Sequence, residues 1–120
     1  MKKTEMLKKN YEFKNVLSKG TYYSGKNIEA FVKKNNKKEN EKNNFLGIAV
    51  SVKIAKAVKR NYIKRLIREN YKNIENKVKP GYSIVFLWKK KIEIKEASYK
   101  NIEKDMEKIL KKANILEEVI

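Results

Sequence analysis

Residues 45–76 read FLGIAVSVKIAKAVKRNYIKRLIRENYKNIEN, and the spacing of the apolar residues changes within this stretch. Residues 45–52 are apolar on both faces of an extended chain, which is typical of a central strand covered on both sides. After Lys53 the apolar residues recur every three or four positions, which predicts a long amphipathic helix over 55–76. The apolar positions of this helix are Ile63, Leu66, Ile67, Tyr71 and Ile74. A buried strand that leads into such a helix indicates that helices pack on a sheet.

The residues before this stretch predict one helix and one strand. A helix is expected over 11–19, with Asn10 as its N-cap and Gly20 as its end. The alternation in NIEAFVKK predicts a strand over 27–34. One face of this strand carries Ile28, Ala30 and Val32, and the other carries Glu29, Phe31 and Lys33. Residues 35–44 contain no apolar residue and show no periodicity, which indicates a solvated hairpin loop before the next strand.

The residues after this stretch predict a third strand and a last helix. Pro80 and Gly81 turn the chain, and residues 82–89 then read as a strand that is apolar on both faces. Helical spacing returns over 96–113. The expected order is αββαβα, and the expected fold class is an α+β sandwich with helices packed on a small central sheet. A chain of this length buries enough surface for one core, so we expect a single domain over 1–120.

The composition excludes many enzyme classes. The chain has no cysteine and no histidine, which excludes disulfides, thiolate chemistry, imidazole catalysis and the usual zinc ligands. No glycine-rich phosphate loop is present. The acidic residues are densest in the C-terminal helix, where Glu103, Asp105 and Glu107 are interleaved with lysines as on a solvent-facing helix. We therefore expect no catalytic residue and no metal ligand in the polypeptide. Without a long apolar run or a signal-peptide pattern, we expect a cytoplasmic protein that does not bind membranes.

The net charge of +17 indicates a polyanionic partner. Only three of the 31 Lys and Arg residues are arginines, and all three lie in the helix expected over 55–76. These arginines are Arg60, Arg65 and Arg68. Because the planar guanidinium binds phosphates and base edges in a bidentate manner, their clustering favours nucleic-acid binding over a solvated surface. On a helical wheel, the arc beside the apolar stripe carries Lys64, Arg65, Arg68 and Lys72.

Two aromatic residues near the start of the chain form a second candidate site. Phe13 and Phe31 stand among Lys14, Lys19 and Lys33. Aromatic rings beside cations suit single-stranded nucleic acid, through base stacking and phosphate contacts. The alternative is that Phe13 only packs the first helix onto the sheet, and its helical spacing favours this interpretation.

Residues 53–69 resemble the signature of the bacterial ribonuclease P protein subunit, approximately K-x-G-x-A-V-x-R-N-R-x-K-R-x-x-R. The residues that match it at the same spacing are Lys53, Ala57, Val58, Arg60, Asn61, Lys64, Arg65 and Arg68. Residues 7–20 are similar to the opening helix of that family, and residues 46–54 are similar to the strand before its signature. The C-terminal third of the chain matches the family only in pattern.

Three positions depart from this signature. The usual glycine of the family is Ala55, a frequent asparagine is Lys56, and the second arginine of the Arg-Asn-Arg core is Tyr62. The first two departures alter the turn into the helix and leave its basic face intact. Tyr62 removes one cation, and we expect its ring either to stack on a base or to pack against the protein.

The resemblance implies the protein subunit of a ribonucleoprotein that removes the 5′ leader from precursor tRNA. The catalytic RNA and its Mg²⁺ ions would perform the hydrolysis, so the polypeptide alone would bind no cofactor. The implied partners are the ribonuclease P RNA and the 5′ leader, with no obligatory protein partner. The implied fold is like that of ribosomal protein S5 domain 2, with a left-handed βαβ crossover.

The resemblance also implies two sets of binding residues. Those expected to bind the RNA subunit are Lys53, Lys56, Arg60, Asn61, Lys64, Arg65 and Arg68. Those expected to bind the leader, in a cleft between the first helix and the sheet, are Phe13, Lys14, Leu17, Phe31 and Lys33. Leu17 stands where an aromatic residue is common in the family, which is expected to weaken stacking.

Two other functions fit a basic helix. A small ribosomal protein would dock the same helix on ribosomal RNA without any role in processing. A DNA-binding helix-turn-helix module fits poorly, because a strand precedes the basic helix where a partner helix should be.

Overall fold

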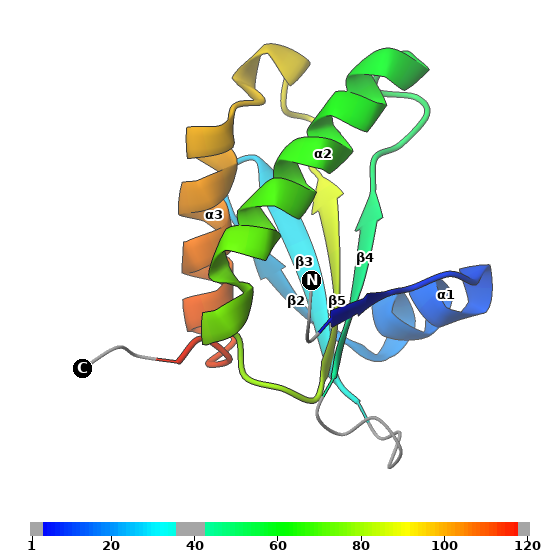
Figure 1. Ribbon diagram of the computed structural model, residues 1–120. Coiled ribbons are helices and arrows are strands. Elements are labelled where there is room, and N and C mark those ends of the chain that lie inside the picture. The colour runs from blue at the N-terminus through cyan, green and yellow to red at the C-terminus, as the bar shows by residue number, and fades with distance from the viewer. Residues whose placement is uncertain (1–3, 36–42, 118–120) are drawn as a thin grey trace.

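The computed structural model describes residues 4–35 and 43–117, which form a mixed sheet with helices on both faces (Figure 1). The strands of these residues are β1 (Thr4–Met6), β2 (Thr21–Ser24), β3 (Ile28–Lys34), β4 (Asn44–Ala49) and β5 (Tyr82–Trp88). Their order in the sheet is β1-β4-β5-β3-β2. β1, β4 and β5 are parallel, whereas β3 is antiparallel to β5 and β2 is antiparallel to β3. The expected α+β class is confirmed.

The helices of the described residues are α1 (Asn10–Lys19), α2 (Ala57–Ile74) and α3 (Tyr99–Lys112), with short 3₁₀ helices at Glu75–Lys77 and Ile94–Glu96. None of them is both long and apolar enough to cross a membrane. The predicted cap of the first helix was wrong, because Lys9 is the N-cap and Asn10 is already helical. A carboxylate stabilises this end instead, since the Lys9 backbone N–H donates to Glu12 Oε1 at 3.0 Å.

Two short edge strands are missing from the expected order αββαβα. β1 pairs with β4, and β2 pairs with β3. With three and four residues, these strands are too short to show a period of two, and only their pairing partners define them. Of the loop expected over 35–44, residues 36–42 lie outside the described residues, and Asn44 already belongs to β4.

The connection from β4 through α2 to β5 has the uncommon hand. β4 and β5 are parallel neighbours in the sheet. In Figure 1 both strands point upward, α2 lies in front of the sheet, and β5 lies to the left of β4. A right-handed crossover would place β5 to the right of β4, as in nearly all parallel βαβ units. The left-handed crossover implied by the family resemblance is therefore confirmed.

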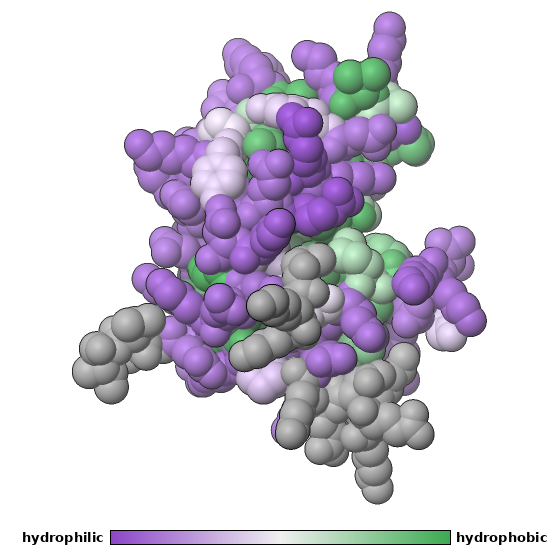
Figure 2. Space-filling model, viewed as in Figure 1, coloured by the Kyte–Doolittle hydropathy of each residue, from purple (hydrophilic) through white to green (hydrophobic). Residues whose placement is uncertain are grey.

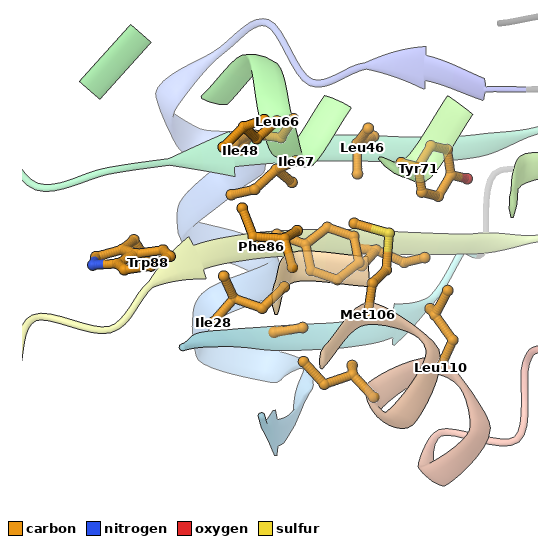
Figure 3. Close-up of a cluster of buried hydrophobic side chains, with 14 of the residues drawn as sticks. Ile28, Leu46, Ile48, Leu66, Ile67, Tyr71, Phe86, Trp88, Met106 and Leu110 are labelled. Atoms are coloured by element: carbon orange, nitrogen blue, oxygen red, sulfur yellow. The ribbon is translucent and has the colours of Figure 1, made fainter. Parts of the chain in front are cut away.

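α2 and α3 bury the larger core against one face of the sheet (Figure 3). Ile28, Leu46 and Phe86 project from three neighbouring strands and are fully buried. Ile67 of α2 and Met106 of α3 enter the same cluster from the helices. This burial is the main apolar contact of α2, and it determines which side of the helix faces solvent.

A pair of hydroxyl groups joins α2 to the edge of the sheet. Tyr71 is fully buried, and its hydroxyl oxygen lies 2.9 Å from Thr4 Oγ1 on β1. Burial raises the pKa of the Tyr71 hydroxyl. The hydrogen bond satisfies two polar groups that the core would otherwise leave unpaired.

α1 covers the opposite face of the sheet with a smaller apolar cluster. Its buried members are Leu7, Val16, Phe45 and Val85, and the partly buried residues packed against them are Phe13, Leu17, Phe31 and Leu87. The close approach of α1 requires glycine at position 47, because a Cβ there would lie 2.6 Å from Phe13 Cε1. The sheet is thus covered on both faces by helices of different size.

One carboxylate holds α3 to the turn between β2 and β3. Asp105 is 6% exposed, and its two oxygens accept hydrogen bonds from three consecutive backbone N–H groups of that turn. The donors are Lys26 at 3.1 Å, Asn27 at 2.6 Å and Ile28 at 3.2 Å. Hydrogen bonds to an ionised acceptor are stronger than neutral ones, so Asp105 is an effective anchor for the last helix.

We expect Asp105→Ala to lower the free energy of unfolding by about 2–4 kcal/mol, because it leaves buried N–H groups without an acceptor. Urea denaturation followed by circular dichroism measures this change. The control is Glu103→Ala, an exposed substitution on the same helix, which should change the free energy by less than about 0.5 kcal/mol. An equal response of the two variants would rule out the anchoring role of Asp105.

Candidate nucleic-acid interface

The side of α2 turned away from the sheet is a basic surface. The buried residues of this helix are Ile63, Leu66, Ile67, Asn70 and Tyr71. Of the residues predicted to bind the RNA subunit, Arg60 and Lys64 are half-buried, and the exposed ones are Lys53, Lys56, Asn61, Arg65 and Arg68. Figure 2 shows hydrophilic side chains over the face formed by α2 and α3. The structure therefore brings all seven predicted residues together on α2 and the turn before it.

The N-terminal end of α2 adds positive potential to this surface. Lys56 is the N-cap, and the first turn contains no acidic side chain. The first backbone N–H groups of a helix, here those of Ala57 and Val58, have no acceptor within the helix, and the helix dipole makes this end positive. Phosphate groups bind well at such ends. Val52 and Val58 are 73% and 81% exposed, so apolar surface lies beside the cations.

Arg60 has a structural contact that the predicted role did not include. Its Nη1 donates a hydrogen bond of 2.6 Å to the carbonyl oxygen of Ala55. This bond closes the turn over 51–56, in which the Ile54 backbone N–H also donates to the Ser51 carbonyl oxygen at 3.1 Å. Because a guanidinium carries five N–H donors, Arg60 can hold this turn and still contact a phosphate.

Arg65 lies between an aromatic ring and a carboxylate. Its Cζ is 5.6 Å from the centre of the Tyr62 ring, and its Nε is 4.0 Å from Glu69 Oε1. The Arg65 side chain is 62% exposed, so the ion pair contributes little to stability. These contacts restrict the guanidinium while leaving it accessible to a ligand.

The sheet face under α1 brings together three of the residues predicted to bind the leader. Phe31 of β3 and Gly47 of β4 lie in one row of the sheet, on either side of β5. Phe13 lies against Gly47, and Leu17 packs in the same cluster. Tyr22 of β2 extends this row, because its ring centre is 5.2 Å from that of Phe31. Phe13, Leu17 and Phe31 therefore pack α1 on the sheet and keep part of their surface exposed.

A cavity of about 350 Å³ opens along one flank of α1. Lys33 lines it, and its Nζ donates a hydrogen bond of 2.5 Å to Asn15 Oδ1. Of the five predicted leader-binding residues, Lys33 alone is among the described lining residues. Adjacent helical residues point about 100° apart, so Lys14 and Asn15 face different flanks of α1. The two lysines predicted to contact the leader therefore do not converge.

The described residues do not provide a metal site. Within 4–35 and 43–117, no group of three or more acidic, cysteine or histidine side chains is placed to hold an ion. Magnesium ions in proteins usually keep several water ligands and are bound through one or two carboxylates together with phosphates of a ligand.

A family model described as Ribonuclease P matches residues 1–114. The chain belongs to the ribonuclease P protein family. It is 36% identical to the ribonuclease P protein component of Clostridioides difficile strain 630, over 94% of this chain and 95% of the relative. It is 40% identical to the component of Clostridium botulinum strain 657, over 94% of this chain and 97% of the relative. The solved structure of the Staphylococcus aureus RNase P protein is similar with a TM-score of 0.77 and 31% identity, covering 92% of this chain and 96% of that chain.

The match to the ribonuclease P family decides between the functions that the sequence left open. It confirms the resemblance carried by residues 53–69 and favours neither a small ribosomal protein nor a helix-turn-helix module. The similarity of the solved structure extends over 92% of this chain.

Two parts of these surfaces were not predicted from the sequence. Tyr22 donates a hydrogen bond of 2.6 Å to Glu29 Oε2, and this bond raises the pKa of the Tyr22 hydroxyl. Tyr22 lies on a strand too short to be predicted, so its face could not be assigned. Tyr11 and Asn15 line the cavity beside α1. Both residues lie on the polar flank of the predicted helix, and this position is the only feature of the sequence from which their exposure could have been predicted.

Because of its hydrogen bond to Ala55, Arg60 should contribute more than Arg68 to the stability of the protein in the absence of RNA. We expect Arg60→Ala to lower the free energy of unfolding by about 0.5–1.5 kcal/mol, because the turn before α2 loses a hydrogen bond. Arg68→Ala should change it by less than about 0.5 kcal/mol, because Arg68 is exposed. Urea titrations of the two variants and the unmodified protein measure both values. Equal stabilities would show that the Ala55 contact does not hold the turn.

Proposed function

We propose that this chain binds the ribonuclease P RNA through the basic surface of α2. As a member of the family, the chain is a protein subunit of the endonuclease that removes the 5′ leader in tRNA maturation. The observation that carries the proposal is the exposure of the signature residues Asn61, Arg65 and Arg68 on the side of α2 away from the core. The proposed RNA-binding residues are Lys53, Lys56, Arg60, Asn61, Lys64, Arg65 and Arg68.

We propose that the RNA subunit, with its Mg²⁺ ions, performs the hydrolysis. The proposed interface contains cations and an amide rather than an acid–base pair. The contribution of the protein is then electrostatic. Its cations neutralise phosphates, release counterions and favour the folded RNA when Mg²⁺ is scarce.

We propose the sheet face under α1 as the contact for the 5′ leader of precursor tRNA. The residues concerned are Phe13, Lys14, Leu17, Phe31 and Lys33. A single-stranded leader has free bases, which suit the partly exposed rings of this face. Because Lys14 and Lys33 face different flanks of α1, they would contact different phosphates. The chain 1–120 would thus act in the cytoplasm as one RNA-binding domain with two surfaces.

The direct test is 5′ cleavage of a leader-bearing precursor tRNA by a bacterial ribonuclease P RNA at low Mg²⁺, with and without this protein. We expect the protein to stimulate cleavage. The combined substitution of Arg60, Arg65 and Arg68 by alanine should abolish the stimulation at the same protein concentration, because it removes the bidentate phosphate contacts.

The matched control removes three charges from another helix. Lys100, Lys104 and Lys108 are exposed on α3, and their combined replacement by alanine gives the same net charge. This variant should still stimulate cleavage. Equal losses in both triple variants would assign the effect to net charge and contradict binding through α2. If the unmodified protein does not stimulate cleavage, the proposal that this chain assists the catalytic RNA is contradicted.

The leader contact predicts a preference for precursor over mature tRNA. We expect Lys14→Ala to reduce this preference by about two- to fivefold, the range for one exposed ion pair. Equilibrium binding of leader-bearing and mature tRNA to the assembled protein–RNA complex measures it. Lys104→Ala, on the other side of the sheet, should leave the preference unchanged. If Lys14→Ala weakens the binding of both tRNAs by the same factor, a contact between Lys14 and the leader is contradicted.

A further inference from the structure

Apolar surface interrupts the basic surface of α2 along one ridge of the helix. Val58 is 81% exposed, and Tyr62, which follows one turn later, is 41% exposed. Residues four apart on a helix are neighbours on its surface, so the two side chains form one strip. Neither belongs to the core clusters of the described residues. The fold therefore does not require an aromatic ring at this position.

The Tyr62 ring lies beside a cation. The Arg65 guanidinium carbon lies 5.6 Å from the ring centre, within the range of a cation–π contact. Glu69 Oε1 lies 4.0 Å from Nε of the same guanidinium. A ring that is already oriented loses less conformational entropy when it binds a ligand.

The surroundings of the ring indicate the chemistry of that ligand. Apart from Glu69, the described residues of α2 include no acidic side chain, and Lys59 and Asn61 are exposed beside Tyr62. A polyanion is therefore favoured, but an uncharged ring cannot bind a phosphate by charge. An aromatic ring flanked by cations suits a nucleobase, which offers a flat face for stacking while its phosphates meet the lysines and arginines.

The base must be unpaired. In an A-form duplex the bases are stacked within the helix, and the deep major groove keeps side chains from reaching them. A ring on an exposed α-helix can stack only on a base that has left the helix, as in a loop, a bulge or a junction.

We propose that Tyr62 stacks on an unpaired nucleobase of the ribonuclease P RNA, with Arg65 orienting the ring. This inference rests on the proposed binding of that RNA through α2. It gives the helix two kinds of contact, since the cations bind phosphates anywhere along the RNA and the ring selects a position where a base is free.

The test compares Tyr62→Ala with Tyr62→Phe in equilibrium binding to a bacterial ribonuclease P RNA over a range of salt concentrations. We expect Tyr62→Ala to weaken binding by about five- to 150-fold, the range for loss of one stacked base. The slope of log affinity against log salt should stay unchanged, because no charge is lost. Tyr62→Phe should bind within about twofold of the unmodified protein. A Phe variant as weak as the Ala variant would overturn stacking in favour of a hydroxyl contact.

A second arm separates stacking from indirect effects through Arg65. If Tyr62 only positions Arg65, then Tyr62→Ala should have no further effect in an Arg65→Ala background. Stacking predicts a further loss in that background. It also predicts that Tyr62→Ala does not change binding to a fully paired RNA duplex, whereas Arg68→Ala weakens it. An equal loss on the duplex would overturn the proposal.

Two controls keep this test distinct from the test of the proposed function. Tyr11→Ala removes an aromatic ring that is 66% exposed on α1, and it should not change binding to the RNA subunit. The triple arginine variant of α2 must weaken that binding if the proposed interface is correct. If the triple arginine variant binds the RNA weakly but Tyr62→Ala binds it normally, only the stacking contact is overturned. If the triple arginine variant binds normally, the interface itself is overturned.

Discussion

The burial of one stripe of α2 on the sheet is the constraint on which the rest of this structure depends. Ile63, Ile67 and Tyr71 have no exposed surface, and they lie against strands that are themselves covered on both faces. Once this stripe is buried, the helix cannot rotate about its axis without exposing apolar side chains to water. The remaining arc must face solvent, and Arg65 and Arg68 occur on that arc, whereas Arg60 is half-buried at the N-terminal end of the helix. The pattern of core residues thus determines where the charged surface lies.

Polar contacts then fix the position of this helix along the sheet. Arg60 bonds to Ala55 at its N-terminal end. In its last turns, Asn70 Nδ2 donates to the Tyr99 carbonyl oxygen at 3.2 Å, and the Tyr71 hydroxyl pairs with Thr4. These contacts join α2 to its entry turn, to α3 and to the edge strand β1. A surface held in this way needs little rearrangement to bind a folded RNA, which lowers the entropic cost of association.

The sequence predicts the elements whose residues repeat with a clear period and not those defined by distant partners. β4, α2 and β5 were located from their apolar spacing alone, and so was the division of β3 into two faces. β1 was missed because its definition depends on pairing with a strand that begins at Asn44. Asp105 looked like a solvent-facing acid among lysines, since its three backbone donors lie about 78 positions earlier in the chain. The hand of the crossover came from the family resemblance, because periodicity carries no information about handedness.

The three arginines show why the net charge alone could not locate the interface. Lysines are spread over every helix of the described chain, so a charge of +17 indicates a polyanion without saying where it binds. Each arginine has a different neighbourhood, since Arg60 closes a turn, Arg65 lies over a ring, and Arg68 is simply exposed. A lysine could supply the charge at all three positions, but not the planar group with five N–H donors that bonds the Ala55 carbonyl at Arg60 and lies over an aromatic ring at Arg65. The choice of arginine at these positions therefore reflects geometry as well as charge.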